Sequence, residues 1–382
     1  MQIWKILAFL GAVLFLSDTI YAQQWTSDSH SEYKRDTLPF SQRFIHRLGV
    51  EGRAGYIFQT NPFLEYSNHQ YKAMKNAYAG HLKYSFQLRP HTVADQAYIG
   101  AYQGIGVGYF NFGNPEELGN PLAVYLFQGG RIAQFSPRIS LNYEWNFGAS
   151  FGWKPYDEYD NPENQIIGSK VNAYLNVNLY LKWALSPKFD LMIGTTGSHF
   201  SNGNTQYPNS GLNTVDCKVG LVYNFNRRAD ELAQSWQRPI VPPFPRHVSY
   251  DLTLFGFWRK KAVAHEGSSG QVPAPGTYNV IGFSFAPMYN FGYKFRAGVA
   301  LDGVYDHSAN MKESYEEENG FYTPPAKKQM ALGLSARGEF VMPYFTVGIG
   351  LGANVLHGGG DMKSFYQILA LKIDVTRNSY LH

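Results

Sequence analysis

Cysteine and charged residues are scarce in this 382-residue chain, and long apolar runs are almost absent. The single cysteine, Cys217, excludes an intrachain disulfide, and its place between Val215 and Val219 favours a small apolar side chain over a catalytic thiol. Only 16% of the residues are charged, against about 25% in soluble domains. The formal net charge of +4 does not predict nucleic-acid binding. After residue 22 no apolar stretch reaches the roughly 18 residues that a transmembrane helix needs.

Aromatic residues and glycine are abundant instead. Phe, Tyr and Trp make up 16% of the chain, with 28 Tyr and 27 Phe, and 38 residues are Gly. The mean hydropathy is moderate, at −0.31. A chain that is aromatic, rich in glycine and moderately polar is typical of a transmembrane β-barrel.

The first 22 residues predict a secretory signal peptide. Lys5 provides the positive n-region, residues 6–16 form the apolar core, and Ala22 ends a cleavage site. Residues 23–47 are polar and irregular, and we expect them to form a periplasmic lead-in.

Period-two alternation is the strongest structural signal in the sequence. Every odd position of residues 139–153 is apolar and every even position is polar or Gly, and residues 171–183 repeat the pattern. Such runs exceed the usual strand of about 5–6 residues and suffice for a tilted transmembrane strand, which needs about 9–11. The sequence therefore predicts an all-β fold, a transmembrane antiparallel β-barrel whose odd positions in both runs face lipid.

About fourteen strands can be predicted in this way. Their ranges are 49–59, 78–89, 96–112, 121–134, 138–153, 169–184, 188–201, 212–225, 248–262, 277–290, 293–306, 327–340, 344–356 and 365–377. Tight turns marked by Pro or Gly alternate with long connections along the chain. In outer-membrane barrels the periplasmic turns are short and the outer loops are long, so this alternation predicts a cell outer-membrane protein and assigns a side to each strand end.

One connection departs from the alternation. Residues 227–247, where a short turn is expected after the eighth strand, combine a helical stretch with a Pro-rich segment. Two architectures fit: a single barrel of about 14 strands, or an 8-stranded barrel followed by a C-terminal β region. The expected division is a barrel half at 48–226, the connection 227–247 and further barrel strands at 248–382.

The candidate site lies at the outer end of the predicted strand 188–201. His199 and Ser201 are two residues apart, so their side chains share one face, about 7 Å apart along the strand. An imidazole and a hydroxyl so placed can act as base and nucleophile. The same face carries Leu191 and Ile193, which predicts that it faces lipid. The site is therefore expected on the outer wall at the level of the outer leaflet.

The longer sequence segment 199–213 is a more specific signal than the His199 and Ser201 pair alone. It runs His199-Phe200-Ser201-Asn202, a polar loop, Pro208-Asn209-Ser210-Gly211, and then Asn213 at the start of a strand. This string resembles the outer-membrane lipid A deacylases, also called acyloxyacyl hydrolases, which are small β-barrels with a Ser-His-Glu triad on the membrane-facing wall. The resemblance covers 189–225, extends back to about residue 48, and gives nothing beyond residue 227.

The resemblance implies a role for each site residue. Ser201 matches the nucleophile of the family, His199 its base and Asn202 its oxyanion donor. Asn213 stands where the family usually has Glu, which puts the activity in doubt. Parity agrees with this position, since Asn213 shares the lipid-facing side of its strand whereas Asp216 points to the lumen. An amide can fix the tautomer of an imidazole but cannot stabilise an imidazolium by charge, so we expect a slower enzyme than a Glu-bearing relative.

The sequence therefore predicts an outer-membrane serine esterase that hydrolyses an ester-linked acyl chain of lipid A in lipopolysaccharide. No metal ligand set and no cofactor are expected, and the expected partners are lipid A and the outer membrane. The alternative is a non-catalytic outer-membrane barrel, such as a porin, a transporter of hydrophobic substrates or an envelope structural protein.

Overall fold

The computed structural model describes residue 42 and residues 44–382, except for 91–92, 235–240, 242, 265–270, 315–316, 318–319 and 377. The expected signal peptide, residues 1–22, and most of the expected lead-in, residues 23–47, lie outside the described residues. The first strand begins at Phe44, within the range expected for the lead-in.

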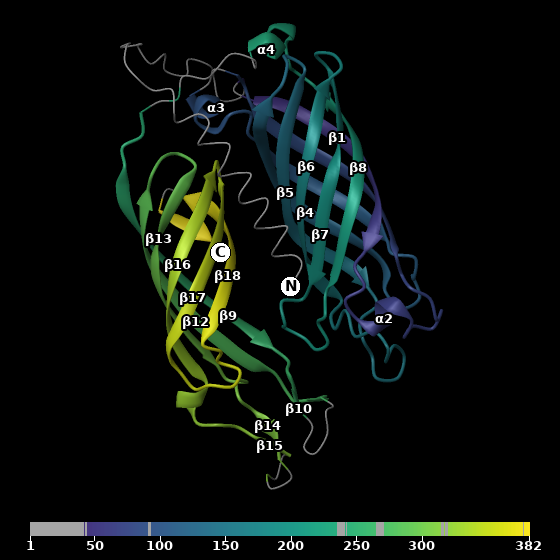
Figure 1. The fold of residues 1–382 in the computed structure, drawn as a ribbon, viewed down its shortest axis with the longest axis vertical. Helices are drawn as coiled ribbons and strands as arrows, with labels where there is room; N and C mark the ends of the chain where they lie inside the picture. Colours follow the sequence, from purple (N-terminus) through teal and green to yellow (C-terminus); the bar gives the residue numbers. More distant parts are fainter. Residues whose placement is uncertain are drawn as a thin grey trace.

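Eight strands close into an antiparallel barrel (Figure 1). They are β1 (Phe44–Ile57), β2 (Asn76–Leu88), β3 (Tyr102–Asn111), β4 (Gly119–Gln134), β5 (Ile139–Trp153), β6 (Val171–Ala184), β7 (Phe189–Ser201) and β8 (Leu212–Asn224). Each strand pairs with its neighbour in sequence, and β1 pairs with β8 from Arg47↔Asn224 to Ile57↔Thr214. The closed ladder leaves no free sheet edge, as a lipid environment requires.

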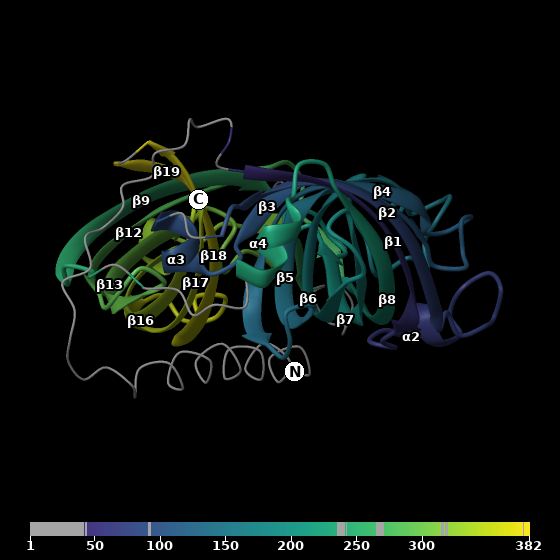
Figure 2. The same cartoon turned by 90° about the horizontal axis from the view of Figure 1, so that it is seen from above.

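The remaining strands form a separate curled sheet, the C-terminal lobe (residues 247–382; Figure 2). Its order is β19-β18-β17-β16-β13-β12-β9. The strands are β9 (His247–Arg259), β12 (Tyr278–Asn290), β13 (Phe295–Asp306), β16 (Met330–Met342), β17 (Phe345–His357), β18 (Phe365–Thr376) and β19 (Ser379–Leu381). Two small hairpins project from it: β10 (Ala262–Ala264) with β11 (Gln271–Pro273), and β14 (Lys312–Glu313) with β15 (Phe321–Tyr322).

The structure thus adopts the second of the two predicted architectures, an eight-stranded barrel followed by a C-terminal β region. The single barrel of about 14 strands does not form, because β1 and β8 pair with each other and close the ladder. One predicted strand start is also displaced. The strand predicted from residue 96 begins at Tyr102, because the short helix α3 (Val93–Tyr98) precedes it.

Both lobes carry their long connections at the same end (Figure 1). The helix α2 (Pro62–Glu65) lies in a long connection of the barrel, and β10, β14 and β15 lie in long connections of the C-terminal lobe. The helix α4 (Ala229–Gln234) lies with α3 at the opposite end. Since periplasmic turns are short, the end that carries α2 is the outer end. Within the described residues, no helix has the length and apolarity to span a membrane.

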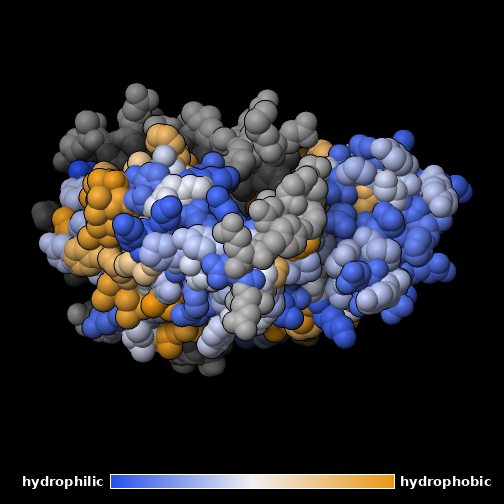
Figure 3. Space-filling model, turned by 90° about the horizontal axis from the view of Figure 1, so that it is seen from below, coloured by the Kyte–Doolittle hydropathy of each residue, from blue (hydrophilic) through white to orange (hydrophobic). Residues whose placement is uncertain are grey.

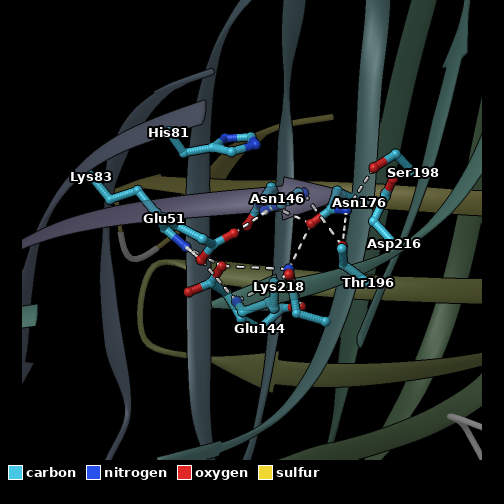
Figure 4. A network of polar contacts seen from close by, with 12 residues as sticks. Glu51, His81, Lys83, Glu144, Asn146, Asn176, Thr196, Ser198, Asp216 and Lys218 are labelled. Carbon is cyan, nitrogen blue, oxygen red and sulfur yellow. Dashed lines mark hydrogen bonds and ion pairs between the residues drawn. The ribbon is translucent and has the colours of Figure 1, made fainter. Parts of the chain in front are cut away.

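The barrel is filled by its inward side chains. An aromatic cluster, which includes Phe110, Tyr174 and Phe200, packs in its outer part. A charged network lies next to this cluster, further from the outer end of the barrel. In it Glu51 contacts Arg53 at 2.6 Å and Lys218 at 2.9 Å (Figure 4). An inner cavity lined by Lys83, Tyr102 and Glu144 measures only about 10 Å³, which is about the room of one water molecule. A larger hollow of about 780 Å³ lies open on the outer side of the wall, where Val50, Leu82 and Val219 line it. An eight-stranded barrel has an interior that side chains can fill, and this one is filled.

The outward positions follow the predicted parity, with two differences. Odd positions of β5 and β6 point away from the lumen, and Val171, Leu181 and Trp183 are exposed. Trp153, predicted to face lipid, instead packs inside against Phe200 at 5.2 Å between ring centroids. The reason is Gly152, whose φ of +88° turns the strand just before it.

The two lobes pack against each other at the periplasmic half of the barrel wall. Tyr143 and Trp145 point outward from β5 but are buried, because the C-terminal lobe covers them. The ring of Tyr143 lies 5.8 Å from that of Phe340, and the ring of Trp145 lies 5.6 Å from that of Phe345. This contact is the second difference from the predicted lipid face.

The outer face of the C-terminal lobe is apolar, like a barrel wall. Exposed side chains include those of Leu252, Leu254 and Trp258 on β9 and Val299 on β13. Seen from the outer end, hydrophobic residues gather on the flank of this lobe, while hydrophilic residues cover the outer loops of the barrel (Figure 3). The C-terminal lobe therefore presents an apolar flank, and the barrel carries polar loops at its outer end.

Candidate active site

The register of β7 and β8 brings three polar side chains together on the outer wall. His199 on β7 pairs directly with Asn213 on β8, and Ser201 follows two residues after His199. His199 Nδ1 lies 2.7 Å from Asn213 Oδ1, and His199 Nε2 lies 2.9 Å from Ser201 Oγ. The three residues that the sequence grouped therefore make a continuous chain of hydrogen bonds.

The chemistry of the partners sets the direction of these bonds. Because the Asn213 carbonyl oxygen can only accept, Nδ1 of His199 carries the ring proton and donates it. Nε2 is then the acceptor for the Ser201 hydroxyl. An imidazole in this tautomer can take the serine proton as a general base.

Burial is graded across the site. Asn213 is only 8% exposed, whereas His199 and Ser201 are half-buried. The orienting residue is thus held within the wall, and the residue that would attack a substrate is accessible from the outside.

Gly211 is a site residue to which the sequence analysis assigned no role. It has a φ of +72°, and a Cβ built on it would lie 3.0 Å from His199 Cε1 and 3.1 Å from the carbonyl oxygen of Phe200. The Gly211 N–H also donates to the carbonyl oxygen of Ile166 at 3.2 Å. The only sequence signal was the Pro-Asn-Ser-Gly turn, which predicts a tight bend but not its contact with the imidazole.

Asn202 lies at the end of β7 and is 8% exposed. Its side-chain N–H donates to the carbonyl oxygen of Gln206 at 2.8 Å, and its backbone N–H donates to Asn209 Oδ1 at 2.9 Å. Asn202 therefore braces the loop 202–211. Its second side-chain hydrogen is the one that the expected oxyanion role would use.

Asp216 lies on the other face of β8, as parity predicted. It pairs across the sheet with Thr196, and Thr214 Oγ1 donates to its Oδ2 at 2.8 Å inside the barrel. Cys217, by contrast, is exposed on the outer wall. Among the residues that the structure describes, no group of three or more His, Cys, Asp or Glu side chains is placed to hold a metal ion.

Two protein-family models match parts of the chain. A model described as lipid A 3-O-deacylase (PagL) matches residues 126–222, which include the whole His199–Asn213 site. A second model, described as the acyloxyacyl hydrolase C-terminal domain, matches residues 248–382. Over these two regions the chain is similar to the lipid A deacylase and acyloxyacyl hydrolase family. The second match spans the C-terminal lobe, the region for which the sequence resemblance gave nothing. The predicted location of the protein in the cell outer membrane is confirmed.

Several solved structures of outer-membrane proteins resemble part of the chain at low identity and low TM-score. Neisserial surface protein A is 10% identical, covering 48% of this chain and 96% of its own, with a TM-score of 0.29. The outer-membrane enzyme PagL is 15% identical, covering 45% and 97%, with a TM-score of 0.28. The N-terminal barrel domain of Pseudomonas aeruginosa OprF is 10% identical, covering 47% and 97%, with a TM-score of 0.28. Curated proteins gave no match.

Proposed function

We propose that this protein is a serine esterase that removes an ester-linked acyl chain from lipid A at the outer leaflet. The observation that carries the proposal is the chain of hydrogen bonds from Ser201 Oγ through His199 to Asn213, at 2.9 and 2.7 Å. It lies on the outer wall of the barrel, at the outer end of β7. Acyl chains of the outer leaflet can reach a nucleophile in that position without leaving the membrane.

The proposed reaction has two halves. Ser201 Oγ attacks the ester carbonyl carbon while His199 Nε2 takes the hydroxyl proton. Collapse of the tetrahedral intermediate breaks the bond to the sugar oxygen, which receives that proton from His199 and leaves as an alcohol. Water, deprotonated by His199, then attacks the acyl-enzyme, and a fatty acid departs as Ser201 is regenerated.

Asn213 and Asn202 serve this reaction in different ways. Asn213 holds the imidazole in the tautomer that presents Nε2 to Ser201, without adding negative charge beside the imidazolium. Asn202, together with nearby backbone N–H groups, supplies hydrogen bonds to the oxyanion of the tetrahedral intermediate. Removing a single oxyanion donor typically slows an enzyme about 10²–10³-fold.

The filled interior of the barrel weighs against the alternative of a porin or transporter. Glu51, Lys83, Glu144 and Lys218 are all buried across the lumen and contact one another. A conducting barrel needs a wide, water-filled interior, which is found in larger barrels.

Mass spectrometry of lipid A from cells with and without the protein tests the proposal. Wild-type protein is expected to remove one ester-linked chain, and Ser201→Ala to leave lipid A intact. Ser198→Ala is the matched control, since Ser198 lies three residues earlier on the inner face, where Asn176 donates to it at 2.9 Å. Unchanged lipid A in cells that hold folded wild-type protein in the outer membrane would favour the non-catalytic alternative.

A further inference from the structure

The C-terminal lobe reaches the loop that follows Ser201. The backbone N–H of Lys260, just past the end of β9, donates to the carbonyl oxygen of Thr205 at 2.7 Å. Thr205 in turn donates to the carbonyl oxygen of Asn202, from its N–H at 3.2 Å and from its hydroxyl at 2.8 Å. Two hydrogen-bonded steps therefore connect the C-terminal lobe to the residue next to Ser201.

The loop itself is uncharged, although lysines stand on both sides of it. Residues 202–211 contain no Lys, Arg, Asp or Glu, so they offer no ion-pairing group to a charged substrate. Lys260 lies on the side of the C-terminal lobe. On the barrel side, Ala173 pairs with Ser201, and Lys170 comes three residues before Ala173, just ahead of the start of β6 at Val171.

Both lysines are available to a ligand. Their side chains are exposed, and within the described part of the chain neither ammonium has a carboxylate oxygen within ion-pair distance. The two cations that flank Lys260 differ in this respect. Arg259 pairs with Asp306 at 2.9 Å, and Lys261 pairs with Asp361. The ion pairs of Arg259 and Lys261 hold the backbone on either side of Lys260, whose ammonium makes no ion pair within the described residues.

The position of the two lysines suits an anionic headgroup. Both lie one residue beyond the outer ends of strands, where a lysine can rest its aliphatic stem on the wall and place its ammonium among the headgroups. An ammonium binds phosphate as a point charge. Lipid A carries phosphate groups on its sugars, and these lie just outside the acyl esters.

We propose that Lys170 and Lys260 bind phosphate groups of the glycolipid headgroup and so orient its acyl ester toward Ser201. The inference rests on the proposed function, because it takes lipid A as the substrate. The C-terminal lobe then takes part in substrate selection. Lys260 is a specificity-determining residue and does not touch the reacting atoms.

Steady-state kinetics with the purified full-length protein tests this role. Lys260→Ala is expected to raise KM about five- to tenfold on phosphorylated lipid A with little change in kcat, because a charge-assisted contact is lost only in binding. On chemically dephosphorylated lipid A it should match the wild type, and Lys260→Arg should restore most of the affinity. Lys170→Ala should act in the same direction. Equal KM values for Lys260→Ala and the wild type on both substrates would overturn the proposal.

A binding measurement separates this inference from the proposed function. In a Ser201→Ala background, where no turnover is expected, binding of labelled phosphorylated lipid A is compared with and without Lys260→Ala. Lys72→Ala is the matched control, since Lys72 is exposed in the connection that contains α2. The helix α2 lies on the flank of the barrel away from the C-terminal lobe. If the wild type cleaves neither substrate, the esterase proposal fails. If Lys260→Ala leaves the binding of phosphorylated lipid A unchanged, the proposed phosphate site is wrong as well.

Discussion

Asn213 Oδ1 accepts a hydrogen bond from His199 Nδ1 across the β7–β8 ladder, at 2.7 Å. The two residues are a directly opposed pair of that ladder. An amide therefore occupies the place at which a carboxylate would complete a Ser-His-acid triad, and it keeps the geometry of the triad without its charge.

The first prediction concerns this amide. Asn213→Ala should lower kcat about tenfold or more, because the imidazole loses the partner that fixes its tautomer. Asn213→Glu should equal or exceed the wild type, since a carboxylate also stabilises the imidazolium. Both are measured as hydrolysis of lipid A by purified protein. Asp216→Asn is the control and should leave turnover unchanged, because Asp216 faces the lumen. An inactive but folded Asp216→Asn beside a fully active Asn213→Ala would reverse the assignment.

The second prediction concerns the glycine beside the imidazole. Gly211→Ala should abolish most activity, because its Cβ would lie 3.0 Å from His199 Cε1. It should also cost about 1 kcal/mol of folding free energy, since the residue has φ +72°. Gly203→Ala is the matched control: it has φ +63° and nothing within 4 Å of the added Cβ. If both variants lost activity equally, backbone strain rather than contact with His199 would be the cause.

The third prediction concerns the charged network of Figure 4. Glu51 contacts Arg53, Lys83 and Lys218, and all four side chains are buried. Glu51→Gln should destabilise the barrel by about 3–5 kcal/mol, because it leaves buried cations uncompensated. The measurement is the temperature at which the folded band disappears on semi-native gels. Glu65→Gln, at an exposed position of α2, should have no effect, and a Glu51→Gln barrel as stable as wild type would contradict the prediction.

The fourth prediction concerns the contact between the lobes. Trp145→Ala should loosen the C-terminal lobe and speed trypsin cleavage between the lobes, because Trp145 packs on Phe345. Trp183→Ala removes a Trp that is 50% exposed on the neighbouring strand, so it should leave the cleavage rate unchanged. Equal rates for the two variants would show that the buried ring does not hold the lobes together.

Local pattern was enough to place most strands and the site. Alternation is a property of a few adjacent residues, so predicted strands such as 188–201 and 344–356 differ by about one residue from β7 and β17. The grouping of His199 with Asn213 also followed from parity, because an antiparallel ladder keeps each face continuous.

Long-range pairing and backbone turns were not predictable in this way. Closure depends on whether β1 meets β8, residues more than a hundred positions apart that no local pattern relates. The burial of Trp145 depends on a second lobe, and the inward turn of Trp153 depends on the φ of Gly152. The bracing role of Asn202 arises because the ladder of β7 with β8 stops at Phe200, so strand parity no longer sets the direction of its side chain.

The packed core of the barrel has a consequence for the permeability barrier of the cell. A protein with an open lumen would let antibiotics and detergents diffuse across the outer membrane in proportion to its copy number. Here the buried ion pairs and aromatic rings occupy that route, and the inner cavity lined by Lys83 and Glu144 has room for about one water molecule. High expression should therefore leave the uptake of small hydrophilic dyes unchanged, and the water that the proposed hydrolysis consumes must come from the external medium.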